Sequence, residues 1–139
     1  MVMRHLNDQF LVGVTGIIFN EKKQILLFHH TYRTVQWSLP GGYLKAKEHP
    51  KEGLEREVKE ESGLTISADT RLRIRTDRDT ARLDIVYIGL FIGGTFSPSA
   101  EVTKAEFFTF EDLPLISKDQ LFLIQEALKR ISLSASFRK

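Results

Sequence analysis

The sequence predicts an α/β fold in which a mixed β-sheet lies between helices. Segments with the composition of β-strands both precede and follow one strongly helical segment near the middle of the chain. A second, amphipathic helix closes the pattern, and packing helices on a sheet is one of the few ways in which such elements bury their apolar sides. At 139 residues the chain can form one domain with its own core, so we expect a single domain over residues 1–139.

The first two strands are predicted as a hairpin. Residues 10–19, FLVGVTGIIF, are apolar and rich in β-branched side chains, which favours a buried strand. A polar turn at residues 20–23 leads into a second strand over residues 24–30. A short third strand, residues 35–39, is expected to end at a Pro-Gly-Gly turn, whose glycines permit close approaches that a side chain would block.

The central helix is predicted from Pro50 to residue 62. Pro50 suits the first helical position, where its missing N–H costs no hydrogen bond. Gly63 suits the left-handed residue that commonly ends a helix. The residues between are good helix formers, with one weak point at Gly53.

Three carboxylates share one face of this helix. Glu57, Glu60 and Glu61 are spaced i, i+3 and i+4 and fall within an arc of roughly 100°, while Leu54 and Val58 on its flank can anchor the helix to a core. Two such charges about 5 Å apart repel by roughly 3 kcal/mol at an effective dielectric constant near 20. A divalent cation would compensate them, and oxygen ligands suit Mg²⁺ or Mn²⁺ rather than Zn²⁺. Taken alone, EREVKEES is more often a solvated acidic helix than a metal site.

Arg56 is placed to orient these carboxylates. It precedes Glu60 by four residues, so the two side chains can meet on the helix surface. It can also reach back to Glu48 with the two-pronged geometry that a guanidinium allows, which would fix the preceding loop to the helix.

The remainder of the chain predicts three more strands and a second helix: strands over residues 65–77, 83–92 and 105–110, and a helix over residues 117–133. Gly93 and Gly94 are expected to end the second of these strands. Four apolar residues share one face of the helix: Leu121, Ile124, Leu128 and Ile131. Residues 134–139 are expected to fray.

Residues 42–64 fit the pattern G-x5-E-x7-R-E-U-x-E-E-x-G-U, where U is a bulky aliphatic residue. Every fixed position is filled: Gly42, Glu48, Arg56, Glu57, Val58, Glu60, Glu61, Gly63 and Leu64. At about 6% usage per residue type, a chance match at one start position is on the order of 10⁻⁸ or less. This stretch resembles the signature of the Nudix hydrolase family. The resemblance implies an α/β/α sandwich with a mixed sheet, a fold that the element count alone does not select.

The resemblance also implies roles for these residues. Glu57 and Glu61 would be the primary metal ligands, with Glu60 as a third ligand or as a residue that holds water. The backbone carbonyl of Gly41 would be a further ligand. The structural brace would consist of Arg56 and Glu48, with Gly42 and Gly63 shaping the turn and the helix end. The general base stays open among Glu57, Glu60 and a loop glutamate.

Glu101 is the best candidate for that loop glutamate. The segment SAEVTKAEFFTFEDLP resembles the closing stretch of the family, in which a glutamate precedes an aromatic-containing strand and a Leu-Pro turn. Such a residue can be a metal ligand or the general base. Glu106 is a weaker rival, because alternation places it within the strand. Either could equally be a surface carboxylate.

Substrate contacts are less clearly marked. Arg71, Arg73 and Arg75 alternate with apolar residues, which predicts that they share one strand face and could meet a polyphosphate, an RNA backbone or a partner subunit. A solvated face is the simpler interpretation. Tyr32 and Trp37 flank the loop before Pro40 and could stack on a nucleobase, although core packing is the default for aromatic residues. The four histidines, His5, His29, His30 and His49, show no metal-ligand spacing and are interpreted as structural or exposed.

These observations predict a hydrolase that uses Mg²⁺ or Mn²⁺ to cleave a pyrophosphate bond in a nucleoside diphosphate linked to another moiety. The alternatives are an RNA 5′-end pyrophosphohydrolase and a non-catalytic nucleotide-binding or regulatory module, although the complete signature favours catalysis. A net charge of +2 indicates no strong polyanion-binding field, so a small nucleotide is favoured over nucleic acid as the partner. The absence of cysteine fits a cytoplasmic location, and no segment resembles a signal peptide or membrane span. The family resemblance is compatible with a homodimer. The pattern specifies neither the nucleotide nor the phosphorus that is attacked.

Overall fold

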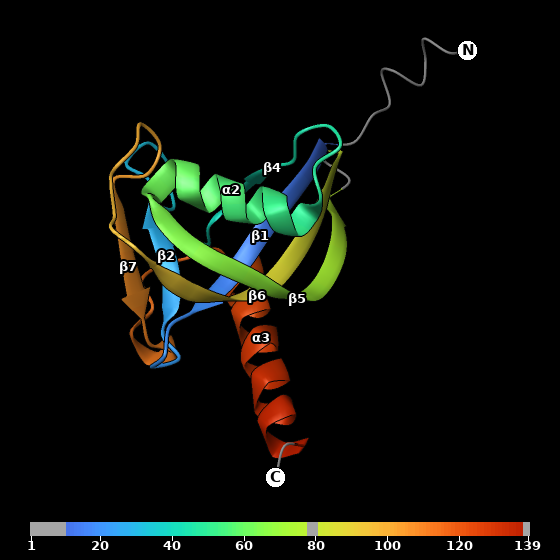
Figure 1. The fold of residues 1–139 in the computed structure, drawn as a ribbon. Coiled ribbons are helices and arrows are strands. Elements are labelled where there is room, and N and C mark those ends of the chain that lie inside the picture. Colours follow the sequence, from blue (N-terminus) through green and yellow to red (C-terminus); the bar gives the residue numbers. More distant parts are fainter. Residues whose placement is uncertain (1–10, 78–80, 138–139) are drawn as a thin grey trace, which may run out of the picture.

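The computed structural model describes residues 11–77 and 81–137 (Figure 1). Seven strands, two α-helices and one 3-10 helix follow one another there: β1 (Leu11–Phe19), β2 (Ile25–His29), β3 (Trp37–Ser38), β4 (Gly41–Tyr43), α2 (Pro50–Ser62), β5 (Leu64–Asp77), β6 (Arg82–Gly94), β7 (Lys104–Phe108), η1 (Phe110–Asp112) and α3 (Lys118–Phe137). None of the helices in these two ranges is long and apolar enough to cross a membrane.

The strands form one mixed sheet, as predicted. Its main order is β3-β2-β1-β6-β5, with β4 also paired to β1 and β7 to β2. The β1–β6 pair is parallel, and the remaining pairs are antiparallel. The predicted hairpin is present, since Phe19 of β1 is opposite Ile25 of β2.

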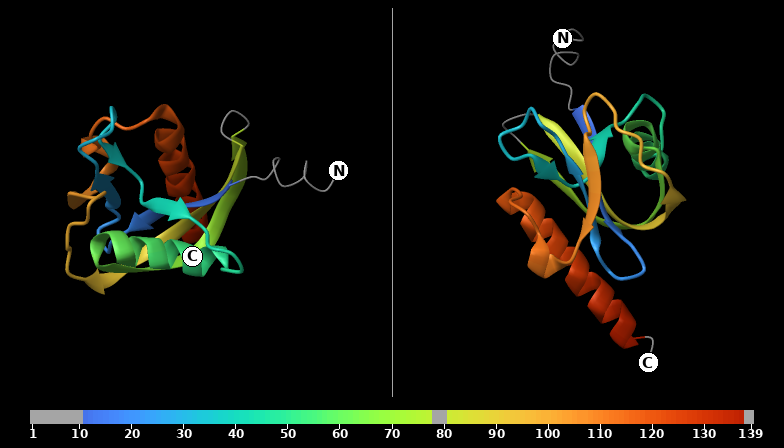
Figure 2. Two further views of the ribbon diagram at one scale, coloured as in Figure 1. Left: turned by 90° about the horizontal axis from the view of Figure 1, so that it is seen from above. Right: turned by 90° about the vertical axis from the view of Figure 1, so that its left-hand side faces the viewer.

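The two α-helices cover opposite faces of the sheet (Figures 1 and 2). On one face, Leu54 and Val58 of α2 are fully buried among side chains from β1, β2, β5 and β6. On the other face, α3 buries Leu123, Ile124 and Ala127 in a second core. The α/β/α layering implied by the resemblance is therefore confirmed, and Leu54 and Val58 anchor α2 as expected.

Strand β1 is the point at which the sheet divides. Along one edge it pairs with β6 over its whole length, from Leu11 opposite Arg82 to Phe19 opposite Leu90. Along the other edge it pairs with β2 only at Phe19, and with β4 only at residues 13–15. Strand β2 therefore diverges from β1, and β4 occupies the space between them. The cleft described below opens at this divergence.

Several boundaries differ from the sequence-based expectation. Strand β6 does not end before Gly93, because Gly93 and Gly94 continue the pairing with β5 opposite Thr65 and Leu64. Strand β7 ends at Phe108, and Phe110 instead begins η1. Helix α3 continues to Phe137, so residues 134–137, predicted to fray, are helical.

The prediction that Arg71, Arg73 and Arg75 share one face is wrong. Arg71 is opposite Tyr87, but Arg73 is opposite Val86, so a β-bulge inserts one residue between them. Adjacent residues Tyr87 and Val86 belong to the cores on opposite faces of the sheet. Because strand partners share a face, Arg71 lies on the α2 side, whereas Arg73 lies on the α3 side.

Candidate functional site

Helix α2 begins and ends where its sequence predicts. Pro50 is the first helical residue, and the His49 ring accepts a hydrogen bond from the Lys51 N–H at 3.1 Å. Gly63 ends the helix in the left-handed conformation with φ 78°, and its N–H donates to the Lys59 carbonyl. Thus His49, expected to be structural or exposed, caps the helix.

Gly53, the predicted weak point of the helix, is required by packing. A Cβ atom there would lie 2.2 Å from Leu44 Cδ2 and 3.0 Å from Glu48 Oε1. Any larger side chain would push the loop of residues 44–48 away from the helix. The lower helix propensity of glycine is the cost of this close approach.

Arg56 joins the loop, the helix and β4, as its spacing predicts. Its guanidinium donates to both Glu48 oxygens, at 2.6 and 3.0 Å, in the expected two-pronged geometry. It also donates to Glu57 at 2.8 Å, to Glu60 at 3.0 Å and to the Tyr43 carbonyl at 3.2 Å. The hydrogen bond from Arg56, followed by one from the Lys45 N–H, lowers the pKa of Glu48 to about 2.

Gly42 provides the space in which the Glu57 carboxylate lies. A Cβ atom at residue 42 would be 2.2 Å from Glu57 Oε2 and 2.4 Å from its Cδ. The absence of a side chain at this strand position therefore lets α2 bring a carboxylate directly against the backbone of β4.

A cleft of about 390 Å³ opens beside these residues. The predicted site residues that line it are Gly41, Gly42, Glu57, Glu61, Glu101 and Tyr32. Glu60 does not line it: its side chain is 56% exposed and interacts with Arg56. The structure thus brings two of the three helix carboxylates together with the loop glutamate and the diglycine turn.

The carboxyl groups in this cleft lie close enough together to influence one another. Burial, hydrogen bonding to Glu57 and the charges of Glu57 and Glu101 together raise the pKa of Glu61 to about 8. Such a set of oxygen donors fits a hard divalent cation, which would remove this repulsion. Within the described part of the chain, however, no three His, Cys, Asp or Glu side chains lie close enough together to hold one ion. Mg²⁺ is commonly bound through only one or two carboxylates together with waters, so such a site does not need three converging side chains.

A pair of histidines holds the loop that carries Glu101. The buried His30 ring bonds through Nδ1 to the Glu101 carbonyl at 2.8 Å, and since a carbonyl only accepts, Nδ1 carries the proton. Two residues further on, the Thr103 N–H donates to the His29 carbonyl at 2.9 Å, and Val102 between them is fully buried. His29 and His30 are thus structural, as expected, whereas His5 lies outside the described residues. Glu106 is an exposed residue of β7 that does not line the cleft.

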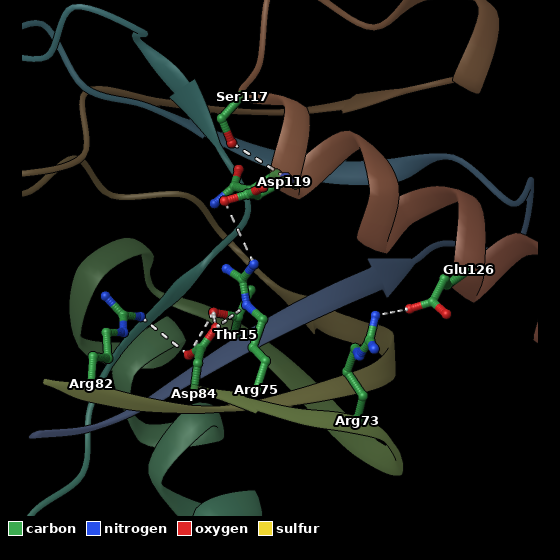
Figure 3. Close-up of polar contacts among 9 residues, drawn as sticks. Thr15, Arg73, Arg75, Arg82, Asp84, Ser117, Asp119 and Glu126 are labelled. Carbon is green, nitrogen blue, oxygen red and sulfur yellow. Dashed lines mark hydrogen bonds and ion pairs between the residues drawn. The ribbon is translucent and has the colours of Figure 1, made fainter. Parts of the chain in front are cut away.

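The remaining candidates are divided between the cleft and the core. Tyr32 is 62% exposed at the cleft, whereas Trp37 packs edge-on between His29 and Phe108, with ring centroids 4.8 and 5.1 Å apart. Arg73 is paired with Glu126 of α3 at 2.7 Å (Figure 3). Arg75 contacts Asp84 at 3.5 Å and Asp119 at 3.8 Å, and neither arginine lines the cleft.

Sequence reasoning missed the polar residues on the α3 side of the cleft. Thr15, Tyr43 and Arg82 line it there, and Thr15 and Arg82 both bond to the buried Asp84 (Figure 3). One signal was available: Asp84 is an acidic residue inside the apolar segment LDIVYIGL. A charge at such a position is rarely buried without a partner.

Comparisons with known proteins agree with the fold and the signature. The family model described as NUDIX domain matches residues 9–129. The chain belongs to the Nudix hydrolase family. It is 32% identical over 124 residues to an ADP-ribose pyrophosphatase of Methanocaldococcus jannaschii, a match that covers 85% of this chain and 73% of that protein. It is 29% identical to the 8-oxo-dGDP phosphatase NUDT18 of Danio rerio, but the match spans 88% of this chain and only 39% of the zebrafish protein.

A solved structure extends this likeness to three dimensions. The crystal structure of an ADP-ribose pyrophosphatase from Streptococcus suis aligns with a TM-score of 0.71 at 30% identity, covering 84% of this chain and 90% of that one. The expected Nudix fold and the expected class of enzyme, a Nudix hydrolase, are thereby confirmed.

Proposed function

We propose that this Nudix hydrolase cleaves the pyrophosphate bond of a nucleoside diphosphate linked to another moiety, in a reaction that depends on Mg²⁺ or Mn²⁺. The observation that carries the proposal is the convergence of Glu57, Glu61 and Glu101 with the diglycine turn on one cleft. The similarity to proteins named ADP-ribose pyrophosphatase favours ADP-ribose or a related compound as substrate. Residues 1–139 would form a single domain, located in the cytoplasm.

The proposed roles follow from where the donors lie. Glu57 and Glu61 would hold the metal ions, with the Gly41 carbonyl and Glu101 as further ligand candidates. Bound divalent ions would supply charge neutralisation for the diphosphate and activation of the attacking water. Glu60 lies outside the cleft lining against Arg56, so its contribution would be to fix Arg56 or to contact a ligand at the rim.

The side chains then have two tasks. One carboxylate must accept a proton from the attacking water while the oxygen of that water forms a bond to phosphorus. The bond from this phosphorus to the bridging oxygen breaks, and the bridging oxygen leaves with the other phosphate. Among the three candidate bases, Glu57 and Glu101 line the cleft, and Glu57 is already engaged by Arg56. We therefore assign the proton acceptor to Glu101. Arg56 and Glu48 keep the helix carboxylates aligned, as outer-shell partners of a metal site generally do.

The test is a panel of ADP-ribose, dinucleoside polyphosphates, nucleoside triphosphates, sugar nucleotides and capped or triphosphorylated RNA, each assayed with Mg²⁺, with Mn²⁺ and with a chelator. Glu57→Gln and Glu61→Gln should lower metal-dependent turnover by about 10²-fold or more, a loss typical of removing a charge-stabilising group, while leaving the fold intact. Glu106→Gln is the matched control for Glu101→Gln. Turnover that persists in chelator, or in folded Glu57→Gln or Glu61→Gln protein, would refute the assignment.

The two alternatives receive less support. An RNA 5′-end pyrophosphohydrolase was suggested by an arginine face, but Arg71 lies on the opposite side from Arg73, and Arg73 and Arg75 are paired with acidic residues. A non-catalytic module is disfavoured by the complete signature, and the position of Glu57 and Glu61 in the cleft lining supports catalysis instead. The RNA and chelator arms of the same panel distinguish these alternatives from the proposed reaction.

A further inference from the structure

A polar network lies on the α3 face of the sheet (Figure 3), and two of its members, Thr15 and Arg82, line the cleft. Its centre is Asp84, which is 3% exposed. The Thr15 hydroxyl donates to this carboxylate at 3.1 Å, and the guanidinium groups of Arg82 and Arg75 lie 3.2 and 3.5 Å from it. These residues come from three adjacent strands, β1, β5 and β6.

Stability alone gives little reason to keep such a network. Taking the Asp84 carboxylate out of water is expensive, and replacing a buried ion pair with apolar residues of similar volume is often neutral or stabilising. The network occupies a face on which Ile17, Phe19 and Val86 form an apolar core only a few residues away. A polar centre at this point of the sheet therefore indicates a role in function rather than in stability.

Thr15 and Arg82 of the network both line the cleft, and Arg82 is the more exposed of the two. Its side chain is 31% exposed and lines the cleft, and its guanidinium lies 5.1 Å from the centre of the Tyr43 ring. The sheet makes room for it at Gly13, where a Cβ atom would come within 2.7 Å of Arg82 Nη2. Arg82 Nε is buried beside Gly13 and has no acceptor among the described residues, so any donor offered to a ligand belongs to the exposed part of the side chain.

Tyr43 extends this surface toward the carboxylates. It is 49% exposed and follows Gly42, the residue against which Glu57 is packed. Tyr43 is opposite Gly13 in one pairing and Asp84 is opposite Gly13 in the other, so the phenol ring and the network lie on the same face. Gly42, against which Glu57 packs, is the residue directly before Tyr43 in β4. A ligand whose phosphates lie at Glu57 can therefore also contact Tyr43.

The chemistry of this surface selects a neutral, flat ligand. Asp84 and Asp119 together offset the charges of Arg82 and Arg75, so a further phosphate gains little there, whereas the N–H donors of the guanidinium remain directional. An exposed aromatic ring beside in-plane donors fits a planar ring that carries acceptors on its edge. We propose that Arg82 and Tyr43 form the subsite that binds the nucleobase of the substrate, with Asp84 and Thr15 as the residues that position Arg82. The proposal rests on the proposed function for the identity of the ligand as a nucleotide.

The test measures binding rather than turnover. Dissociation constants are determined by calorimetry for nucleoside 5′-monophosphates and for ribose 5-phosphate, which lacks only the base. The variants are Tyr43→Ala and Arg82→Lys. The second keeps the positive charge but loses the planar pair of guanidinium donors. The matched control for the first is Phe122→Ala, because Phe122 is also half-exposed and lies 5.4 Å from an arginine guanidinium, that of Arg73, but outside the cleft.

We expect wild-type protein to bind a nucleoside monophosphate at least about tenfold more tightly than ribose 5-phosphate, as one base stacked on an aromatic side chain provides. Tyr43→Ala should remove most of this preference and Arg82→Lys part of it, with ribose 5-phosphate binding unchanged and thermal melting checking the fold. Phe122→Ala should keep the preference. Equal binding of the two ligands by wild type, or a full preference in folded Tyr43→Ala, would overturn the subsite.

The same measurements separate this inference from the proposed reaction. If the wild type hydrolyses no compound of the panel, but its preference for the base is lost in the Tyr43→Ala variant, the subsite is supported and the pyrophosphohydrolase is rejected. Hydrolysis in the panel with a base preference that Tyr43→Ala leaves intact would do the reverse.

Discussion

The substitution Gly42→Ala isolates the contact between β4 and the helix carboxylate. The added Cβ would lie 2.2 Å from Glu57 Oε2, whereas ordinary contacts begin at 3.4 Å, so the carboxylate must move by about 1 Å. The atoms in the way are the far end of one side chain, and the φ of Gly42 is not in the left-handed region, so the backbone can accept alanine. We therefore expect a folded protein with a displaced Glu57.

Displacements of about 1 Å at a reacting centre can cost about 10²-fold in rate, so kcat of Gly42→Ala should fall by that order. The assay is release of nucleoside monophosphate from the best panel substrate with Mg²⁺, alongside thermal melting. Gly93→Ala is the control, because Gly93 is also a strand glycine but a Cβ there would meet nothing within 4 Å. Wild-type turnover in Gly42→Ala at an unchanged melting temperature would show that the position of Glu57 does not govern the reaction.

Two predictions concern stability. Because Arg56 lowers the folded-state pKa of Glu48 from 4.5 to about 2, this carboxylate stabilises the fold fully above about pH 4.5 and loses that effect as the pH falls toward 2. The difference in melting temperature between wild type and Glu48→Gln should therefore shrink over this interval. A constant difference would contradict the ion pair. Leu54→Ala should lower the free energy of unfolding by about 2–5 kcal/mol in urea titrations, since Leu54 is fully buried under α2, whereas Leu133→Ala, at a 60% exposed position of α3, should change it by less than about 0.5 kcal/mol.

Local features of the helix could be predicted because they depend on near neighbours. Pro50, Gly63 and the contact between Arg56 and Glu60 all follow from spacings of four residues or fewer or from a single residue type. The contact between Arg56 and Glu48 spans eight residues and could also be predicted, because a guanidinium can bind both oxygens of a carboxylate in the loop that precedes the helix. The packing role of Gly53 could not be predicted, since helix propensity does not register the neighbouring Leu44.

Features that depend on distant strands could not be predicted. Counting alternation along residues 71–75 assumes a regular strand, but the β-bulge depends on how β6 is aligned and reverses the face of Arg71. The bond between Thr15 and Asp84 joins residues 69 positions apart, so no local pattern indicates it. Only the burial of a charge within an apolar strand marked that region of the chain.

The contacts of Arg56 divide the cleft into two sides with different freedom to change. A single guanidinium engages three carboxylates and a backbone carbonyl, so lysine could not replace it and no one of its partners can shift alone. The opposite wall has a fixed part and an open part: Asp84 at the start of β6 is buried and bonds to Thr15, Arg82 and Arg75, whereas Tyr32, in the connection between β2 and β3, is 62% exposed. Over evolutionary time, new ligand preferences can therefore accumulate in that connection, by substitution or loop insertion, while the bond-breaking apparatus is inherited unaltered.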